Sequence, residues 1–320
     1  MSRGATTDAM TTGIVRTDEP VDVCVVIPTR GRPELVLRAV GSALAQVTAP
    51  AEVLVVVDGP DPATETALAA VGDPRLRVLV LERNGGAAAA RNAGVRATAC
   101  EWVAFLDDDD EWRPGKLAAQ WAHVQRSGNA GSTVFATAVE WRADDFAFRY
   151  PVRSPHPGER VADYLFVRTR PGEGMLAVPT LLLRREVAAA HPMAEHLGTH
   201  EEYDWFLDLE SAGCGFSVLL EPLTIVHAPS LRASVSTRAT WHASLSWALR
   251  RRSALGERAF SAFCLTDVAR AARREGGVRV LFAVVAMALT ARPSLLELAR
   301  FGAVWILPQH VRWRLSGRSR

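Results

Sequence analysis

The sequence predicts an α/β fold with a mostly parallel sheet flanked by helices, followed by a C-terminal helical extension. Short apolar, β-branched runs alternate with amphipathic segments over residues 21–117, which is the pattern of repeated β-α units. The links between these units are short, so right-handed crossovers and a parallel, doubly wound sheet are expected. From residue 240 onward, the apolar runs have a helical period and basic flanks.

Four apolar runs are expected to form neighbouring parallel strands. Residues 21–27 (VDVCVVI) are almost continuously apolar, as in a strand that is buried on both faces. Residues 52–57 (EVLVVV) and 76–81 have the same character. The fourth run, residues 102–106 (WVAFL), leads into four consecutive carboxylates at residues 107–110, which indicates a buried strand that ends at water.

Helices are expected between these strands. Residues 33–46 begin with a proline and carry an apolar stripe, residues 64–71 follow an Asp-Gly-Pro turn, and residues 87–98 are rich in alanine. A further helix is expected to begin at Pro114, directly after the acidic run.

The second half of the chain is predicted to continue the sheet. Residues 132–141 and 216–220 have the pattern of strands, and a helix with an apolar face is expected after residue 200. Residues 144–174 are rich in Arg, Pro and Gly, and we expect them to form variable surface structure that closes over a ligand as a mobile flap.

The composition limits the class of protein. The chain has 320 residues, of which 48% are hydrophobic, and this fits one large or two small globular domains. A net charge of +2 provides no field that would attract nucleic acid. Residues 1–20 are small and polar, so they predict a disordered lead-in without the apolar core of a signal peptide. The four cysteines lie far apart without a CxxC pair, as expected of reduced residues in a cytoplasmic protein.

Several polar residues directly follow the ends of the predicted strands. Ligands of such sheets bind at the carboxyl ends of the strands. Thr29, Arg30, Asp58 and the acidic run 107–110 occupy such ends, and Arg91 lies early in the helix after the third strand. We therefore expect these side chains to line one crevice. Carboxylates this close together are tolerated when they are solvated or share a cation, so both a solvated loop and a metal site fit this stretch.

The ordered motifs resemble those of the family 2 glycosyltransferases. They are VIPTRGR at residues 26–32, VVDG at 56–59, NGGAAAARNAG at 84–94 and FLDDDDEW at 105–112. The resemblance extends from residue 21 to residue 117 and continues more loosely to Glu221. It implies the Rossmann-like GT-A fold and the transfer of a sugar, with inversion, from a nucleotide-diphosphate sugar.

The resemblance assigns donor-binding roles to residues of the first half. Pro28, Thr29 and Arg30 match the loop that holds the nucleoside. Asp58 matches the carboxylate that reads the base, and Arg91 matches the arginine beside the base and the phosphates. The chain has neither a GxxxxGK[ST] loop nor a GxGxxG fingerprint after the first strand, which disfavours a dinucleotide-binding dehydrogenase on the same kind of sheet.

The resemblance implies a divalent cation, Mn²⁺ or Mg²⁺, as cofactor. Asp107 and Asp109 match the ends of the family's DXD triplet, with Asp109 as the direct metal ligand and Asp108 between them in the donor site. The middle position of the triplet is itself acidic here, so the identity of the ligand oxygens stays open. Such cations prefer hard oxygen ligands and neutralise a departing diphosphate. In the second half, Arg232 matches a family arginine near the diphosphate.

The general base is expected in the helix after residue 200. On pattern alone, Glu201 and Glu202 are acids of the first helical turn, where they complement the helix dipole. The family has an acidic pair here whose second member is the base, and Glu202 occupies that position with Glu in place of the usual Asp. Asp204 is the alternate candidate.

These assignments divide the chain into parts. Residues 21–225 are the expected catalytic domain, with a nucleotide-sugar-binding half up to residue 127 and an acceptor half from residue 128. Residues 226–320 are the expected helical extension. The longest apolar stretch, residues 278–289, is too short to span a bilayer. A cytoplasmic location is therefore expected, and the basic C-terminal helices either cap the core or rest on the inner face of the membrane.

The partners follow from the family. The resemblance implies a nucleotide-sugar donor, most commonly a UDP-sugar, and an acceptor that is a glycan, a lipid-linked glycan or a small molecule. Two other functions stay open: a sugar nucleotidyltransferase, which needs a Gly- and Lys-rich triphosphate loop where PTRGR stands, and a non-catalytic nucleotide-sugar or glycan-binding module of the same fold.

Overall fold

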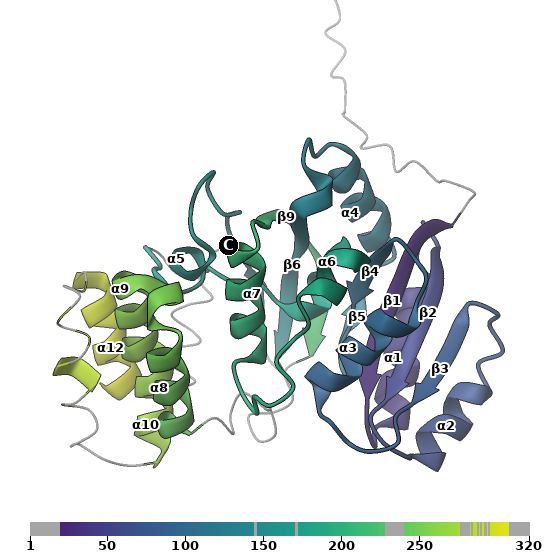
Figure 1. Ribbon diagram of the computed structural model, residues 1–320, viewed down its shortest axis with the longest axis horizontal. Coiled ribbons are helices and arrows are strands. Elements are labelled where there is room, and N and C mark those ends of the chain that lie inside the picture. Colours follow the sequence, from purple (N-terminus) through teal and green to yellow (C-terminus); the bar gives the residue numbers. More distant parts are fainter. Residues whose placement is uncertain are drawn as a thin grey trace, which may run out of the picture.

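The computed structural model describes residues 20–143, 146–169, 172–227 and 240–275, together with residues 282, 284–286, 288, 290, 293 and 295–306. A mixed sheet runs through the molecule, helices cover both of its faces, and the C-terminal helices stand beside it (Figure 1). Residues 1–19 of the expected lead-in and the candidate Arg232 lie outside the described residues.

The first half forms the parallel part of the sheet, in the order β3-β2-β1-β4. The strands are β1 (Val21–Thr29), β2 (Pro50–Val57), β3 (Leu76–Val80) and β4 (Trp102–Phe105), each at a predicted run. Alternate side chains of β1 enter two different cores, with Val25 in the core on one face and Val26 in the core on the other. Burial on both faces explains the continuous apolar run.

Helices cover the two faces as the β-α pattern predicts. They are α1 (Pro33–Leu44), α2 (Pro62–Ala69), α3 (Ala87–Ala97) and α4 (Lys116–Gln125). α1, α2 and α4 contribute to one core and α3 to the other. α3 lies close to the sheet because it has glycine at position 94, where a Cβ would overlap Val26 Cγ1.

The second half adds antiparallel pairs, so the sheet is mixed. Its strands are β6 (Thr133–Ala143), β7 (Phe146–Tyr150), β8 (Leu182–Arg184) and β9 (Gly215–His227), and β9 pairs with the short β5 (Glu111–Trp112) of the first half. β8 lies antiparallel between β4 and β6, whereas β6 and β9 are parallel. β9 is longer than the strand predicted at 216–220 and continues two residues past the expected domain boundary at 225.

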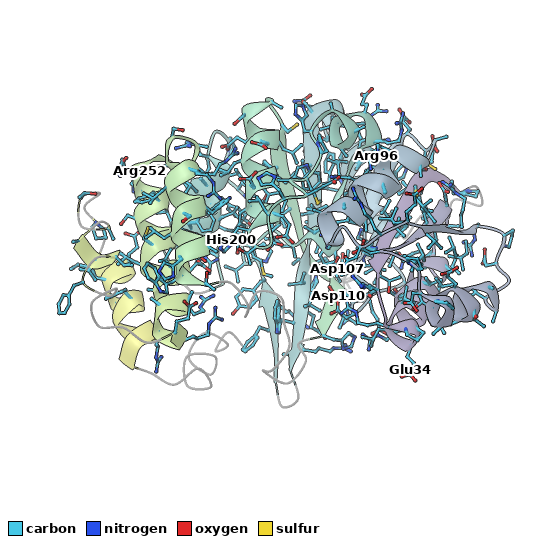
Figure 2. All side chains as sticks on the ribbon, turned by 60° about the horizontal axis from the view of Figure 1, so that its bottom comes forward. Glu34, Arg96, Asp107, Asp110, His200 and Arg252 are labelled. Carbon is cyan, nitrogen blue, oxygen red and sulfur yellow. The ribbon has the colours of Figure 1, made fainter. Side chains whose placement is uncertain are left out.

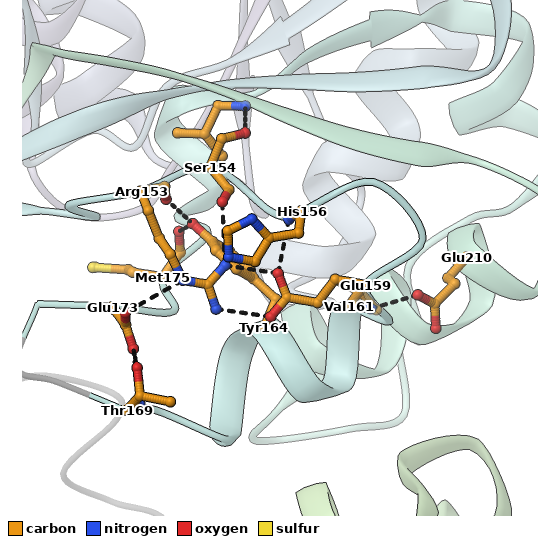
Figure 3. A network of polar contacts seen from close by, with 11 residues as sticks. Arg153, Ser154, His156, Glu159, Val161, Tyr164, Thr169, Glu173, Met175 and Glu210 are labelled. Carbon is orange, nitrogen blue, oxygen red and sulfur yellow. Dashed lines mark hydrogen bonds and ion pairs between the residues drawn. The ribbon is translucent and has the colours of Figure 1, made fainter.

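The expectation of variable surface structure at residues 144–174 is wrong for residues 161–166, whereas closure of the segment over a ligand stays a prediction. The segment contains β7 and the helix α5 (Val161–Phe166), whose Tyr164, Leu165 and Phe166 are buried in the core. Arg153 forms a bidentate ion pair with Glu159 (2.7 Å from each terminal nitrogen) and reaches the buried Glu173 (Nε–Oε1 3.4 Å) (Figure 3). The apolar side chains that anchor this segment are spaced too irregularly for a sequence pattern to reveal them.

Helices of the acceptor half and of the extension share one core. The former are α6 (Arg185–Ala190) and α7 (Glu201–Ser211), and the latter are α8 (Trp241–Arg250), α9 (Arg252–Phe263), α10 (Ala269–Glu275) and α12 (Leu295–Ile306). Buried residues of α7, α8 and α9 belong to the same cluster as those of α3 and β4. Among the described residues, no helix has both the length and the apolar character needed to cross a membrane.

Candidate active site

The ends of β1 and β4 are joined through two side chains. The Thr29 hydroxyl donates to Asp108 Oδ2 (2.7 Å), and the backbone N–H of Asp58 donates to the Thr29 carbonyl (2.9 Å). Pro28 is buried in the last residues of β1, whereas Arg30 is exposed just beyond it. The predicted convergence of strand ends therefore exists, because parallel pairing of β1 with β2 and with β4 aligns their carboxyl ends.

Asp58 organises the turn that precedes α3. Its two carboxylate oxygens accept the backbone N–H groups of Gly85 (2.7 Å) and Gly86 (2.9 Å), and the residue is 6% exposed. Gly86 has φ +87°, a conformation that favours glycine. A Cβ at Gly85 would lie 2.7 Å from Ala89 Cβ, so glycine is required there by close packing and at position 86 by the positive φ.

Arg91 lies buried at the same edge of the sheet. Its Nη2 pairs with Asp107 Oδ1 at 2.5 Å. Burial disfavours the guanidinium charge, but the attraction of Asp107, Glu202 and Glu201 outweighs it, so the pKa of Arg91 is raised. Arg91 Nε is buried without a hydrogen-bond partner in the described chain. A permanently charged group with an unpartnered donor is suited to bind an anion.

The four carboxylates after β4 differ in their surroundings. The side chains of Asp107 and Asp109 are 28% and 38% exposed, whereas Asp108 and Asp110 are 1% and 4% exposed as residues. Burial raises the pKa of Asp108 to about 6, although Arg32 and the Thr29 hydroxyl act in the opposite direction. Burial and repulsion from Asp107 and Asp109 raise the pKa of Asp110. The alternation leaves the first and third carboxylates accessible.

Two arginines, one in α1 and one just before it, neutralise the acidic run. Arg32 binds both Asp108 (Nη2–Oδ1 2.6 Å) and Asp109 (Nη1–Oδ2 3.0 Å). Arg38 donates to the Asp109 carbonyl oxygen (2.5 Å) and lies 3.7 Å from Glu111. The sequence interpretation treated Arg32 as a residue of the loop after the first strand and gave Arg38 no role.

His227 is a second residue that sequence reasoning missed. It ends β9, and its Nε2 lies 2.9 Å from Glu111 Oε2. Its backbone N–H donates to Asp110 Oδ1 (3.3 Å). β9 brings it there because Ile225 pairs with Glu111 in the antiparallel β5–β9 ladder, a pairing with no local sequence signal. Figure 2 shows Asp107 and Asp110 at this edge, with His200 toward the C-terminal helices.

The two candidates for the base occupy different environments on α7. Glu202 keeps some exposed surface, yet its carboxyl group is sufficiently enclosed that burial, together with repulsion from Glu201, raises its pKa to about 7, partly offset by Arg91. Asp204 is buried and accepts the Trp247 indole N–H (2.9 Å) and faces Arg251 (3.3 Å). Glu202 therefore lies within the electrostatic reach of Arg91, whereas Asp204 forms the contact with α8.

The donor set was compared with the needs of a divalent cation. No group of three or more His, Cys, Asp or Glu side chains in the described residues is arranged to hold a metal ion. Mg²⁺ is commonly bound by one or two carboxylates together with phosphate oxygens and water. The accessible oxygens of Asp107 and Asp109 fit that requirement, with a diphosphate supplying the remaining ligands.

Similar sequences cover part of this chain. ExoO, a succinoglycan biosynthesis protein of Rhizobium meliloti, is 39% identical over 117 residues, which is 37% of this chain and 33% of ExoO. AmsB, an amylovoran biosynthesis glycosyltransferase of Erwinia amylovora, is 26% identical over 156 residues, which is 48% of this chain and 50% of AmsB. The chain thus spans a third to a half of these relatives.

The fold and the family are shown by two further comparisons. The crystal structure of S. aureus TarS 1-349 in complex with UDP superposes with a TM-score of 0.56 and 16% identity, over 92% of this chain and 87% of that one. At this identity the likeness shows the fold, the GT-A fold of mixed α/β type. The family described as "Glycosyl transferase family 2" matches residues 24–189. By this match over more than half of its length, the chain belongs to the family 2 glycosyltransferases.

Proposed function

We propose that this protein transfers a sugar from a nucleotide-diphosphate sugar to an acceptor hydroxyl during synthesis of a polysaccharide. The observation that carries the proposal is the meeting, at one sheet edge, of a buried guanidinium with a free Nε, two accessible carboxylates and a partly enclosed glutamate. Relatives are named for succinoglycan and amylovoran biosynthesis. Their names and the shared family support this role.

The donor is proposed to be a UDP-sugar. TarS structures are in complex with UDP and with UDP-GlcNAc, and the similar fold supports a nucleotide at the corresponding strand ends. Pro28, Thr29, Arg30 and Asp58 would surround the nucleoside, and Arg91 would bind the diphosphate through its unpartnered Nε. Arg232, which lies outside the described residues, is proposed to contact the diphosphate.

Mn²⁺ or Mg²⁺ is proposed to be held by Asp109 and Asp107, whose side chains are accessible, while Asp108 is used by Thr29 and Arg32. When bound, the cation supplies charge neutralisation for the departing diphosphate. Because Arg91 is already paired with Asp107, it places a second positive charge beside the same carboxylate. The two charges together would offset the negative charge that develops on the leaving group.

Glu202 is proposed to accept the proton of the acceptor hydroxyl. The acceptor oxygen then forms a bond to the anomeric carbon, and the bond from that carbon to the phosphate oxygen breaks, with its electron pair leaving on the nucleotide diphosphate. One displacement inverts the anomeric configuration. A carboxyl group with a pKa of about 7 is well matched to this task near neutral pH. Asp204, which is tied to Trp247, is the less favoured base.

The acceptor and the place of reaction belong to the same proposal. The names of the relatives favour a growing glycan as acceptor. WfgD of Escherichia coli, which is named as a glucosyltransferase for a GlcNAc-diphosphoundecaprenol, favours a lipid-linked one. A cytoplasmic protein whose basic C-terminal helices rest on the inner face of the membrane would reach such an acceptor. Binding to vesicles of anionic and of neutral lipid would test this, and equal, weak binding to both would contradict it.

A panel of nucleotide sugars tests the function. The purified chain is incubated with UDP-Glc, UDP-GlcNAc, UDP-Gal, GDP-Man and dTDP-Glc, with Mn²⁺ or with EDTA, and the released nucleotide diphosphate is measured. We expect one donor to be hydrolysed with Mn²⁺ only, and its initial sugar product, read by NMR, to have inverted configuration. Binding without hydrolysis would indicate a non-catalytic module, and release of pyrophosphate from a nucleoside triphosphate plus sugar phosphate would indicate a nucleotidyltransferase.

A further inference from the structure

The helix that carries Glu202 is tied to the C-terminal helix α8 by polar contacts. The Trp247 indole N–H donates to Asp204 Oδ1 (2.9 Å), and both groups are buried. Arg251, directly after α8, lies 3.3 Å from Asp204 Oδ1 and also pairs with Asp208, one turn further along α7. The C-terminal end of α8 and the residue that follows it thus bind the first two turns of α7. Figure 1 shows the two helices side by side.

A second contact holds the residue before α7. His200 has φ +65°, the one non-glycine residue with positive φ in the described chain. Its Nε2 lies 2.9 Å from the hydroxyl of Ser244 in α8, and its ring stacks on Tyr203 with centroids 5.8 Å apart. Such a backbone conformation persists only where surrounding contacts determine it. Here those contacts come from α8 and α7, immediately before Glu201 and Glu202.

Glu202 itself lacks such support. Its carboxylate forms no hydrogen bond with another described residue, and Arg91 acts on it only as a nearby charge. The position of its side chain therefore depends on the packing around it and on the backbone of the first turn of α7, and not on a hydrogen bond. That turn is held on one side by His200 and on the other by Asp204, and both of these residues contact α8.

We propose that Trp247 and Arg251 are positioning residues, which hold Glu202 at the distance from the acceptor that proton transfer requires. This inference rests on the proposed function, because it takes Glu202 as the base. It gives the C-terminal extension a part in catalysis, beyond capping the core. The family match ends at residue 189, so neither α7 nor α8 is part of it.

The test separates positioning from binding. Trp247→Phe keeps an aromatic ring but removes the N–H donor, and Arg251→Gln removes the charge. We expect each to lower kcat for hydrolysis of the donor selected from the panel by about tenfold or more, because small displacements of a catalytic group are costly. The donor KM and the UDP affinity measured by calorimetry should stay at the wild-type values, and Arg251→Lys should restore part of kcat.

Matched controls lie in the same region. Trp241→Phe changes a tryptophan of α8 whose ring is tilted against that of His242, and Arg252→Gln changes an arginine that pairs with Glu257. Both should retain wild-type kcat. If Trp247→Phe fails to fold, Arg251→Gln decides the question, because Arg251 is only partly buried.

The outcomes distinguish the two proposals. Wild-type kcat in both Trp247→Phe and Arg251→Gln, in a chain where Glu202→Gln is inactive, would overturn the positioning role alone. Equal losses of kcat and of UDP affinity would also overturn it, since the contacts would then support the fold of the whole site. Full turnover by Glu202→Gln, or no hydrolysis of any donor by the wild type, would overturn the proposed function and this inference with it.

Discussion

The Thr29 hydroxyl donates a hydrogen bond to Asp108 Oδ2 at 2.7 Å, although 79 positions separate the two residues in the sequence. This contact uses the buried carboxylate of the acidic run and leaves its neighbours on either side accessible. The run therefore consists of two buried carboxylates, Asp108 and Asp110, and two accessible ones, Asp107 and Asp109, which are paired with Arg91 and Arg32.

Replacement of Asp109 should abolish metal-dependent binding without unfolding the protein. Its side chain is 38% exposed and belongs to no core cluster, so Asp109→Asn removes a ligand charge and little packing. We expect UDP affinity, measured by calorimetry, to lose its increase on addition of Mn²⁺. Asp73→Asn, which changes a carboxylate paired with Arg75, is the control. A Mn²⁺ effect that survives in Asp109→Asn would contradict the proposed metal ligand.

Removal of Arg32 should strengthen binding of the cation alone. Arg32 occupies oxygens of both Asp108 and Asp109, so a divalent cation at Asp109 has to compete with a guanidinium. In Arg32→Gln, calorimetry with Mn²⁺ in the absence of nucleotide should give a lower Kd than in the wild type. Arg77→Gln, which breaks a pair with Glu52 away from this run, should leave the Kd unchanged. Weaker Mn²⁺ binding in Arg32→Gln would show that the arginine orients the carboxylates instead.

Turnover should rise with pH through about 7. Burial raises the pKa of Glu202 to about 7, and the base acts as the carboxylate, so kcat should be low in acid and reach a plateau above that value. Glu202→Gln should lack both the activity and the rise, whereas Glu202→Asp should recover part of each. A kcat that stays constant from about pH 5.5 to about pH 8.5, on both sides of the expected pKa, would show that another residue is the base.

The raised pKa of Glu202 also affects the free energy of unfolding, which should fall with rising pH while kcat rises. The pKa of Glu202 is raised from its ordinary value of 4.5 to about 7 in the fold, so the folded state favours the protonated form. The stability that this provides is complete below pH 4.5 and is lost as the pH rises through about 7. The free energy of unfolding of Glu202→Gln, measured in urea, should therefore fall less than that of the wild type across this range. Parallel curves would indicate that the group titrates normally.

Loss of one Asp58 oxygen should loosen the turn before α3. Asp58→Asn keeps the size of the side chain but replaces an acceptor by an N–H donor that faces the amide of Gly85 or Gly86. We expect a cost of about 1–3 kcal/mol in the free energy of unfolding, as for a buried unsatisfied group, and weaker UDP binding. Asp22→Asn changes an exposed carboxylate that accepts one backbone N–H, and its cost should stay within about 0.5 kcal/mol. Equal costs in both variants would argue against the role of Asp58.

The Arg153 network should be a major source of stability for residues 151–169. Arg153→Met removes one positive partner of Glu173, whose side chain is 1% exposed, and the two ion-pair contacts of Glu159. The expected loss is about 1–3 kcal/mol in urea unfolding, because partly buried carboxylates lose a positively charged partner. The double variant Arg153→Met with Glu173→Gln should recover part of it. A loss no larger than that of Arg252→Gln, at an exposed pair, would show that solvent already screens the network.

Much of the first half could be predicted because its signals are local. The apolar runs at β1 and β4 mark strands buried on both faces, and the order of β-α units makes their carboxyl ends meet. Thr29, Asp58, Arg91 and Asp107 come together for this reason alone. The sequence contains glycine at 85 and 86 within one of the family motifs, but only the structure shows that their backbone N–H groups donate to Asp58.

The second half was predicted less well because its contacts are set by pairing between distant segments. His227 reaches Asp110 across 117 positions only because β5 and β9 are antiparallel, and α5 enters the core through side chains without a regular period.

The sequence by itself determined the fold of the first half and the set of polar residues at its strand ends, because parallel β-α units align those ends whatever the rest of the chain does. Only the tertiary structure decided which carboxylates stay accessible, that Arg32 and Arg38 neutralise the run, and that Asp204 faces α8 while Glu202 faces Arg91. Burial and charge pairing depend on which distant side chains arrive at a site, and that follows from packing rather than from local pattern.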